Sequence, residues 1–469
     1  MTATLAPIAS PMAQQPIEPL AETLQEKIAE IDAYLEAYAD IKHFSGTILI
    51  SREGRSPLLR SYGQANREHQ VENTPTTKFR IGSVTKQFTA VAVLQLYEEG
   101  FLELQAPISK YLPDYPEGDR ITVHHLLTHT AGIPEYLSPE HFPDLLEWMR
   151  QSSTTSQVVD RIKVLPLEFE PGEKFSYSNS GYILLTHIIE TVSDQPYADY
   201  LQTNIFDPLE MKDTGYELPQ TVIPHLAQGY IFVGDDTYLQ STPLDMSLPQ
   251  GAGGLYSTVT DLARWTQWLH DGRMDSAVLS ATAKKSLMQP IASMEPDASN
   301  PESFYGYGLV VDTHLGQPRI HHNGGISGFS SALIHYPEAA LTVTVLSNLE
   351  TATVGQIAAD LAAIAFDKPY ELPKQQEAIE LDPALYEKYV GTYQLLPEMQ
   401  VTIDVVDNQL TAQATGQGAF VLYPTSEIDF FATVAEITVT FSLSEDDTVE
   451  GLTLRQLGRD LFAPKIVQE

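Results

Sequence analysis

A serine followed three places later by a lysine, at the start of a predicted buried helix, restricts this chain more than any other feature. Ser83 and Lys86 lie in the run FRIGSVTKQFTA at 79–90. Residues three apart share one face of a helix, so the amine would lie near enough to accept the hydroxyl proton. Gly82 allows a tight turn, and the apolar residues that follow predict a helix sunk into a core: Phe88, Val91, Ala92 and Leu94. The pattern indicates a nucleophile with its activator at a helix N-terminus that stabilises negative charge.

A tyrosine and an asparagine two residues apart form a second candidate motif. Tyr177 and Asn179 follow Pro171 and Gly172, which mark a loop, the usual place for functional side chains. A phenol can move a proton if nearby cations stabilise its phenolate, and an amide can hold a substrate carbonyl. An ordinary tyrosine on a surface loop is the alternative.

A third motif is the run HHNGGISGF at 321–329. His322, Asn323, Gly324 and Gly325 are followed by nearly alternating apolar residues at 330–336 and 341–345, which predict two strands of a hairpin. A glycine-rich strand lets a substrate backbone approach the sheet edge closely. For Gly324 and Gly325 alone, a β-turn remains the alternative.

These motifs in this order, S-x-x-K, Y-x-N and H-x-G, resemble those of the serine hydrolases related to class C β-lactamases. That family includes penicillin-binding-type peptidases, D-amino-acid peptidases and class C-like carboxylesterases. The resemblance spans roughly residues 40–365 and extends to four flanking phrases: FSG at 44–46, YLPDY at 111–115, LLTHTAG at 126–132 and GGLYS at 253–257.

The resemblance implies a role for each motif residue. It makes Ser83 the nucleophile and gives proton handling to Lys86 and Tyr177. It implies that substrate binding and the oxyanion hole involve Asn179, His322, Asn323, Gly324 and Gly325, with the amides of Ser83 and Gly325 as oxyanion donors. The expected activity is hydrolysis through an acyl-enzyme at ester or amide bonds, a class that includes β-lactams and D-amino-acid peptides. A penicillin-binding or sensor-type protein with slow or no turnover is the alternative.

The sequence leaves the identity of the base open. Lowering the pKa of a lysine from about 10.4 to about 7 costs roughly 4 to 5 kcal/mol, which burial beside other donors could supply. Alternatively, a charged Lys86 holds Tyr177 as phenolate and the two groups titrate as a coupled pair. Glu168, Glu170 and Glu173 precede the tyrosine motif, and nothing marks one of them as a base for deacylation.

His322 stands where many members of the family have lysine. An unperturbed histidine is mostly neutral at about pH 7, whereas lysine would be a permanent cation for a substrate carboxylate. We therefore expect weak recognition of acidic substrates such as penicillins, which favours an esterase or a peptidase over an enzyme dedicated to destroying antibiotics.

Three nearby histidines raise the question of a metal. His125 and His129 are four apart, as two zinc ligands on a helix would be, and His124 is adjacent. Leu126 stands where metalloproteases carry a glutamate, and the run LTHTAG looks like the family's structural loop after a helix. We expect no metal and no cofactor.

Composition narrows the class of partner. The net charge of −35 repels nucleic acid and anionic membranes, so the expected partner is a small molecule or a short peptide.

The chain contains no cysteine, which excludes a cysteine nucleophile and disulfides, and no stretch is apolar enough to span a bilayer. No complete signal peptide is present, so the sequence as written predicts a cytoplasmic protein, or a periplasmic or secreted one if its start is truncated. The oligomeric state is left open.

The order of predicted elements indicates an α+β fold, with an antiparallel sheet flanked by helices, as in β-lactamases and transpeptidases. We expect a disordered segment at 1–20 and a hydrolase domain at 21–367, which begins with a helix over roughly 21–39 and a hairpin over 47–60. A proline-rich linker at 368–383 then leads to a small antiparallel β-barrel at 384–469. The phrases YVGTY at 389–393, GQ at 416–417 and PTS at 424–426 make this last domain resemble the lipocalin-like domain appended to such hydrolases.

Overall fold

The structure is a computed structural model, and it describes most of the chain from residue 26 onward. The described residues are 26–466 without 54, 219, 235–236, 272–277, 295–302, 374–377, 397–398, 407, 416–418, 433–436, 445 and 457–458. The predicted disordered segment at 1–20 and the glycine phrase at 416–417 therefore lie outside the described residues, as does part of the predicted linker.

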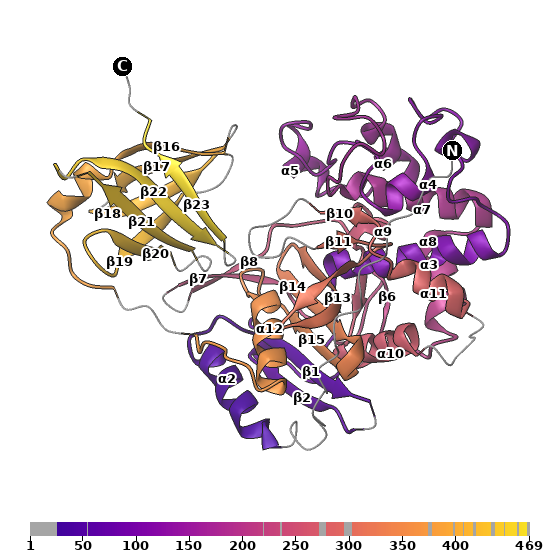
Figure 1. Cartoon of the computed structure of the whole chain (residues 1–469), viewed down its shortest axis with the longest axis horizontal. Coiled ribbons are helices and arrows are strands. Elements are labelled where there is room, and N and C mark those ends of the chain that lie inside the picture. Colours follow the sequence, from indigo (N-terminus) through magenta and orange to yellow (C-terminus); the bar gives the residue numbers. More distant parts are fainter. Residues whose placement is uncertain are drawn as a thin grey trace, which may run out of the picture.

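A large antiparallel sheet joins the two ends of the first body (Figure 1). Its strand order is β10-β11-β12-β13-β14-β15-β1-β2, so the early hairpin pairs with the late strands, and Gly46 lies opposite Ser347. This confirms the prediction of an antiparallel sheet built from both ends of one domain. The strands are β1 Gly46–Arg52, β2 Leu58–Tyr62, β10 Ala292–Ser293, β11 Phe304–Tyr305, β12 Val310–His314, β13 Gln317–Ile326, β14 Phe329–Tyr336 and β15 Leu341–Ser347.

Both faces of this sheet are covered, because its central strands are apolar on both sides. Along β1, Ile48 and Ile50 belong to one buried cluster, and Leu49 belongs to another. The first cluster lies under α2 (Ile28–Asp40) and α12 (Val354–Ala365), the helices before and after the sheet in the chain (Figure 1). The second cluster faces the larger helical part of the molecule.

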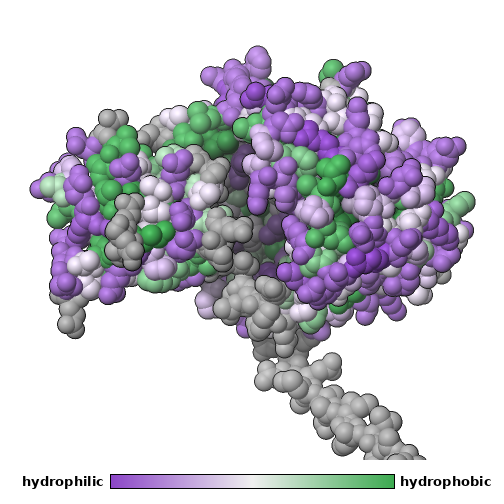
Figure 2. Space-filling view, turned by 90° about the horizontal axis from the view of Figure 1, so that it is seen from above, coloured by the Kyte–Doolittle hydropathy of each residue, from purple (hydrophilic) through white to green (hydrophobic). Residues whose placement is uncertain are grey.

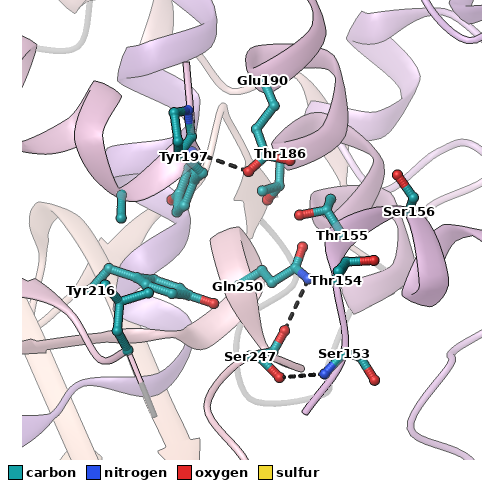
Figure 3. A pocket seen from close by; sticks show the side chains of 13 residues that line it. Ser153, Thr154, Thr155, Ser156, Thr186, Glu190, Tyr197, Tyr216, Ser247 and Gln250 are labelled. Carbon is teal, nitrogen blue, oxygen red and sulfur yellow. Dashed lines mark hydrogen bonds between the residues drawn. The ribbon is translucent and has the colours of Figure 1, made fainter. Parts of the chain in front are cut away.

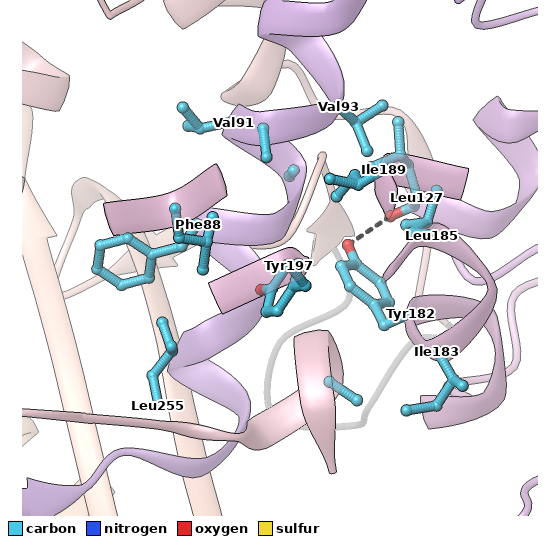
Figure 4. Close-up of a cluster of buried hydrophobic side chains, with 14 of the residues drawn as sticks. Phe88, Val91, Val93, Leu127, Tyr182, Ile183, Leu185, Ile189, Tyr197 and Leu255 are labelled. Carbon is cyan, nitrogen blue, oxygen red and sulfur yellow. Dashed lines mark hydrogen bonds between the residues drawn. The ribbon is translucent and has the colours of Figure 1, made fainter. Parts of the chain in front are cut away.

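The helical part is built around α3 (Thr85–Glu98), which is buried over twelve consecutive residues. Phe88 on this helix packs against Trp265, with ring centroids 4.0 Å apart, and Tyr182 donates a hydrogen bond to the Leu127 carbonyl oxygen in the same core (Figure 4). The other helices here are α4 Val123–Leu127, α5 Leu145–Trp148, α6 Thr155–Ile162, α7 Asn179–Ser193, α8 Tyr197–Leu201, α9 Gln250–Gly253, α10 Val259–His270 and α11 Ala281–Leu287.

Small sheets tie the loops of this part together. In one of them β9 pairs with both β5 and β6, which brings the segment before Ser83 next to the segment after α9. The small strands are β3 Gln64–Asn66, β4 Val71–Glu72, β5 Phe79–Arg80, β6 Gly215–Tyr216, β7 Tyr230–Gly234, β8 Thr237–Gln240 and β9 Leu255–Ser257.

The C-terminal part is a nearly closed β-barrel of eight antiparallel strands in sequence order, which confirms the barrel prediction (Figure 1). Its first and last strands meet where the Ile466 amide donates to the Thr392 carbonyl oxygen at 2.8 Å. The interior is apolar and includes Tyr389, Tyr393 and Phe441. The strands are β16 Gly391–Leu396, β17 Met399–Val406, β18 Gln409–Ala414, β19 Phe420–Pro424, β20 Asp429–Ala432, β21 Ile437–Leu443, β22 Val449–Gln456 and β23 Arg459–Pro464.

The face of the molecule seen in Figure 2 is predominantly hydrophilic, with scattered apolar areas. Among the described residues, no helix has both the length and the apolar character that crossing a membrane would require. The polar surface is consistent with the large excess of acidic over basic residues, 62 against 27.

We predict that Phe88→Ala lowers the free energy of unfolding of the first body by about 3–5 kcal/mol, because it removes a fully buried ring from the Trp265 contact. Urea unfolding followed by tryptophan fluorescence measures this, since Trp148, Trp265 and Trp268 all lie in that body. Phe101→Ala is the matched control, because Phe101 is 58% exposed and its loss should change stability by about 0.5 kcal/mol or less. Equal losses in the two variants would contradict the assignment of Phe88 to the core.

Candidate active site

Ser83 and Lys86 come together at the turn that leads into α3. Ser83 lies in a short 3-10 helix, η1 (Gly82–Val84), and Lys86 lies in the first turn of α3. The Lys86 Nζ is 3.1 Å from the Ser83 Oγ, as the spacing predicted. The lysine is fully buried, whereas the serine is partly accessible. The hydroxyl can therefore meet a substrate while the amine behind it is shielded from water.

Two further acceptors surround the amine. Lys86 Nζ donates to Asn179 Oδ1 at 2.7 Å and to the Ala252 carbonyl oxygen at 2.8 Å. Burial lowers the pKa of Lys86 to about 7, against a smaller opposing effect of the Glu135 carboxylate. A neutral amine has two N–H groups and one lone pair. Since two groups around it are acceptors only, its lone pair is left for the hydroxyl of Ser83.

Tyr177 lies on the open side of this pair. Its side chain is 37% exposed, and Lys86 Nζ is 4.8 Å from the centroid of its ring. Desolvation raises the pKa of Tyr177 well above its usual value, and a hydrogen bond with Ser83 opposes this only in part. The phenol is therefore protonated at neutral pH, in contrast to the phenolate that the coupled-pair alternative requires.

Asn179, the first residue of α7, is held by a glutamate that the motifs did not reveal. The Glu135 Oε2 accepts from the Asn179 backbone amide at 2.7 Å and from Asn179 Nδ2 at 3.0 Å. A carboxylate only accepts, so it fixes which end of the Asn179 amide group points to Lys86. One N–H of Asn179 Nδ2 therefore donates to Glu135 and is not available to a substrate.

His322 lies on β13 with both ring nitrogens occupied. Nδ1 donates to the Asn323 carbonyl oxygen at 2.6 Å, so Nε2 accepts from the Tyr305 hydroxyl at 3.0 Å. Burial, together with the nearby Lys86, lowers the pKa of His322 to about 3. His322 is therefore neutral at physiological pH, in agreement with the expectation that it offers no cation to a substrate.

The glycines of β13 allow the strand to approach the serine turn. A Cβ on Gly324 would lie 2.1 Å from the Ile81 carbonyl oxygen and 2.9 Å from the Ser83 nitrogen. Gly82 has a φ of +48°, and a Cβ there would lie 2.9 Å from the Gly325 nitrogen. The amides of Ser83 and Gly325 are thus on facing segments whose close contact only glycine permits.

Asn323 is the one predicted site residue that the structure does not bring to the others. Its Nδ2 lies beside Gly355 of α12, where an added Cβ would be 2.9 Å away. Side chains alternate between the two faces of a strand, so His322 and Gly324 face the serine turn and Asn323 faces α12. Its side chain is therefore not positioned to bind a substrate at Ser83.

The three histidines considered as metal ligands have separate partners. His124 Nδ1 is 2.9 Å from the Tyr307 hydroxyl, His125 Nδ1 accepts from the Thr122 amide, and His129 Nδ1 accepts from the Ser178 amide. Across the described part of the chain, no group of three or more histidine, aspartate or glutamate side chains is placed to hold a metal ion.

A model of the β-lactamase family matches residues 31–366, and a model of a domain of unknown function, DUF3471, matches residues 375–465. The chain belongs to the β-lactamase family. The β-lactamase match covers both the large sheet and the helical part, and the second match covers the barrel.

Proteins similar to this β-lactamase family chain include penicillin-binding proteins and a D-amino acid amidase. A penicillin-binding protein of Bacillus subtilis (strain 168) is 32% identical over 445 residues, which cover 90% of this chain and 95% of that protein. The octameric penicillin-binding protein homologue from Pyrococcus abyssi is 26% identical with a TM-score of 0.64, covering 93% of this chain and 99% of that one. A D-amino acid amidase from Ochrobactrum anthropi SV3, complexed with L-phenylalanine amide, is 25% identical with a TM-score of 0.62, covering 72% and 99%.

Two residues near the site were not assigned a role from the sequence. Glu135 is one of them, since a lone glutamate 44 residues before its partner forms no local motif. The other is His129, whose buried ring lies 4.2 Å from the Tyr177 ring and 4.6 Å from the Tyr305 ring, measured between centroids. Its place in the run LTHTAG was the only available signal. The glutamates considered earlier, Glu168, Glu170 and Glu173, are exposed.

We predict that Gly324→Ala slows the labelling of Ser83 by a fluorophosphonate probe about 100-fold or more, because the new Cβ would push β13 away from the serine turn. Gly325→Ala is the matched comparison, since a Cβ there meets open space and the amide is retained. Its labelling rate should fall far less. Similar rates in the two variants would contradict the proposed contact between β13 and the serine turn.

Proposed function

We propose that this protein is a serine hydrolase that cleaves ester or amide bonds through an acyl-enzyme on Ser83. The observation that carries the proposal is the fully buried Lys86 amine, with a pKa of about 7, 3.1 Å from the Ser83 Oγ. Such an amine is about half neutral at neutral pH and can take the hydroxyl proton as the serine attacks. The family membership and the likeness to a D-amino acid amidase agree with it.

The proposed reaction has two halves. Ser83 Oγ bonds to the substrate carbonyl carbon while its proton passes to Lys86, and the amides of Ser83 and Gly325 hold the oxyanion. Collapse of the intermediate breaks the bond to the leaving group, which receives a proton through Lys86 and the protonated Tyr177. Water then attacks the acyl-enzyme by the same route, which releases the acid and restores Ser83. No separate glutamate is required for the second half.

The substrate class follows from the charges around the site. His322 is neutral, and Glu135 accepts hydrogen bonds from Asn179, so neither of these two described residues offers a cation to a substrate carboxylate. We propose neutral esters and amides, including D-amino-acid amides, as better substrates than penicillins. The alternative is a penicillin-binding or sensor-type protein that acylates without turnover, which the name of the Bacillus subtilis relative favours.

We further propose that the C-terminal barrel is the lipocalin-like domain of such hydrolases.

The decisive experiment is steady-state kinetics with intact-mass analysis, using a short-chain p-nitrophenyl ester, a D-amino-acid p-nitroanilide and a chromogenic cephalosporin. We expect turnover of the first two, with a covalent adduct on the wild type and neither turnover nor adduct on Ser83→Ala. A burst equal to the enzyme concentration with no further turnover would establish the penicillin-binding alternative. Full activity of Ser83→Ala would refute both.

The pH dependence tests Lys86 as the base. We predict that kcat/KM rises with pH through about 7 and is level above it, because only the neutral amine accepts a proton. In Glu135→Gln this acid limb should move to lower pH, since the carboxylate opposes the lowering of the lysine pKa. The rate itself should also fall, because the substitution disturbs the hold on Asn179.

The control for this prediction is Glu140→Gln, which removes a charge from an exposed residue five positions away. Its pH profile should match the wild type. An acid limb that stays in place or moves upward in Glu135→Gln would show that the titrating group is not Lys86.

A further inference from the structure

A second candidate site is a cavity of about 350 Å³ whose lining includes residues of α6, α7, α8 and α9 (Figure 3). Six of its lining residues carry the argument: Thr155, Ser156, Glu190, Tyr216, Ser247 and Gln250. The lining includes none of the catalytic candidates. It contains hydroxyl groups, one carboxylate and no basic side chain. Its volume falls within the range of pockets that bind small molecules, about 300–1,000 Å³.

One wall of the cavity is the N-terminus of α6. Thr154 caps this eight-residue helix through a reciprocal pair of bonds with Gln157. The amides of the next two residues, Thr155 and Ser156, have no acceptor in the part of the chain that the structure describes, and the first turn contains no acidic residue. The free N–H groups and the helix dipole give this wall a partial positive charge that favours a carboxylate.

Another wall offers the opposite charge. Glu190 on α7 is half-buried, and its Oε1 accepts from the Tyr197 amide at 3.1 Å. Within the described ranges, its carboxylate forms no ion pair with a basic side chain. A positively charged group in the cavity would be its natural counterpart.

A buried polar group of Gln250 supplies an independent observation that points to a ligand. Its side chain is 3% exposed, and Nε2 donates to the Ser247 carbonyl oxygen at 2.9 Å (Figure 3 shows the two residues side by side). Its Oε1 is buried without a donor among the described residues. Leaving such a buried oxygen unpaired is unfavourable, and a ligand with N–H groups would satisfy it.

We propose that this cavity binds a free α-amino acid. The carboxylate would bind to the amides of Thr155 and Ser156, and the ammonium group to Glu190 and the Gln250 oxygen. A simple anion would be repelled by Glu190, and a simple cation would meet the positive end of α6. A small zwitterion satisfies both walls at once.

The position of the cavity links it to the catalytic lysine. Gln250 is the first residue of α9, and the Ala252 carbonyl oxygen two residues later accepts from Lys86 Nζ. Between them, the Gly251 amide donates to Thr186, which also lines the cavity. A ligand in the cavity would therefore shift the Ala252 carbonyl oxygen, which accepts from the Lys86 amine. This last consequence rests on the proposed function, whereas the binding itself does not.

Isothermal titration calorimetry on the Ser83→Ala protein tests the binding without turnover. The probes are D- and L-alanine, with alaninamide, which lacks the carboxylate, and propionate, which lacks the ammonium group. We expect saturable binding of at least one alanine enantiomer below about 10 mM, with neither analogue saturating. Absence of saturable binding of alanine, or equal binding of propionate, would overturn the proposal whether or not the protein is a hydrolase.

Variants then locate the site. Glu190→Gln keeps an oxygen for the Tyr197 amide and should weaken alanine binding at least tenfold, which is about 1.4 kcal/mol. Gln250→Met should weaken it as well. Glu99→Gln, an exposed charge change just after α3, and Tyr177→Ala, which alters the candidate active site, should leave the affinity unchanged. An unchanged affinity in Glu190→Gln, or a tenfold loss in Tyr177→Ala, would place the bound amino acid elsewhere and refute the proposal.

Discussion

The buried amine of Lys86 is the interaction on which the rest of this site depends. An ammonium group is costly to bury, and the protein reduces that cost by lowering the lysine pKa to about 7 and by surrounding the amine with acceptors. Those acceptors come from α7 and α9, and the lysine comes from α3. Three helices must therefore be packed in fixed positions before the amine can face Ser83. The apolar contacts around Phe88, two residues further along α3, provide that packing.

The hydrogen bonds around Lys86 have a defined order of donors and acceptors. Glu135 can only accept, so it takes both N–H contacts from Asn179 and turns the asparagine oxygen toward Lys86. The Ala252 carbonyl takes the second amine hydrogen. Of the three groups hydrogen-bonded to Lys86 Nζ, the Ser83 hydroxyl is the one that can donate to the lone pair of the neutral amine. In its neutral form the amine is thus oriented by fixed acceptors to take a proton from Ser83, as the proposed function requires.

Local sequence patterns were enough to predict the separate motifs of this site. Contacts between residues far apart in the chain could not be predicted from them. The spacing of Ser83 and Lys86 is a helical property, and the alternation in the late strands is a property of a sheet, so both could be read from neighbouring residues. Glu135 could not, because its contact with Asn179 depends on how a loop folds over the start of α7. The position of Asn323, apart from the other candidates, has a simpler cause: a residue adjacent to His322 in a strand must face the other way.

The short helix α9 explains how a strained residue can persist next to the base. Gln250 has a φ of +37°, a conformation that costs a side chain of its kind about 1–3 kcal/mol unless its surroundings enforce it. The following residue is clamped on both sides, because the Gly251 amide donates to Thr186 and its carbonyl accepts from Thr89. Gly251 has no room for a Cβ, which would lie 2.4 Å from the Thr186 hydroxyl. The clamp holds the Ala252 carbonyl against Lys86 and also holds Gln250 in the second cavity. The same clamp therefore fixes both the Ala252 acceptor of Lys86 and the Gln250 side chain, whose oxygen has no donor among the described residues.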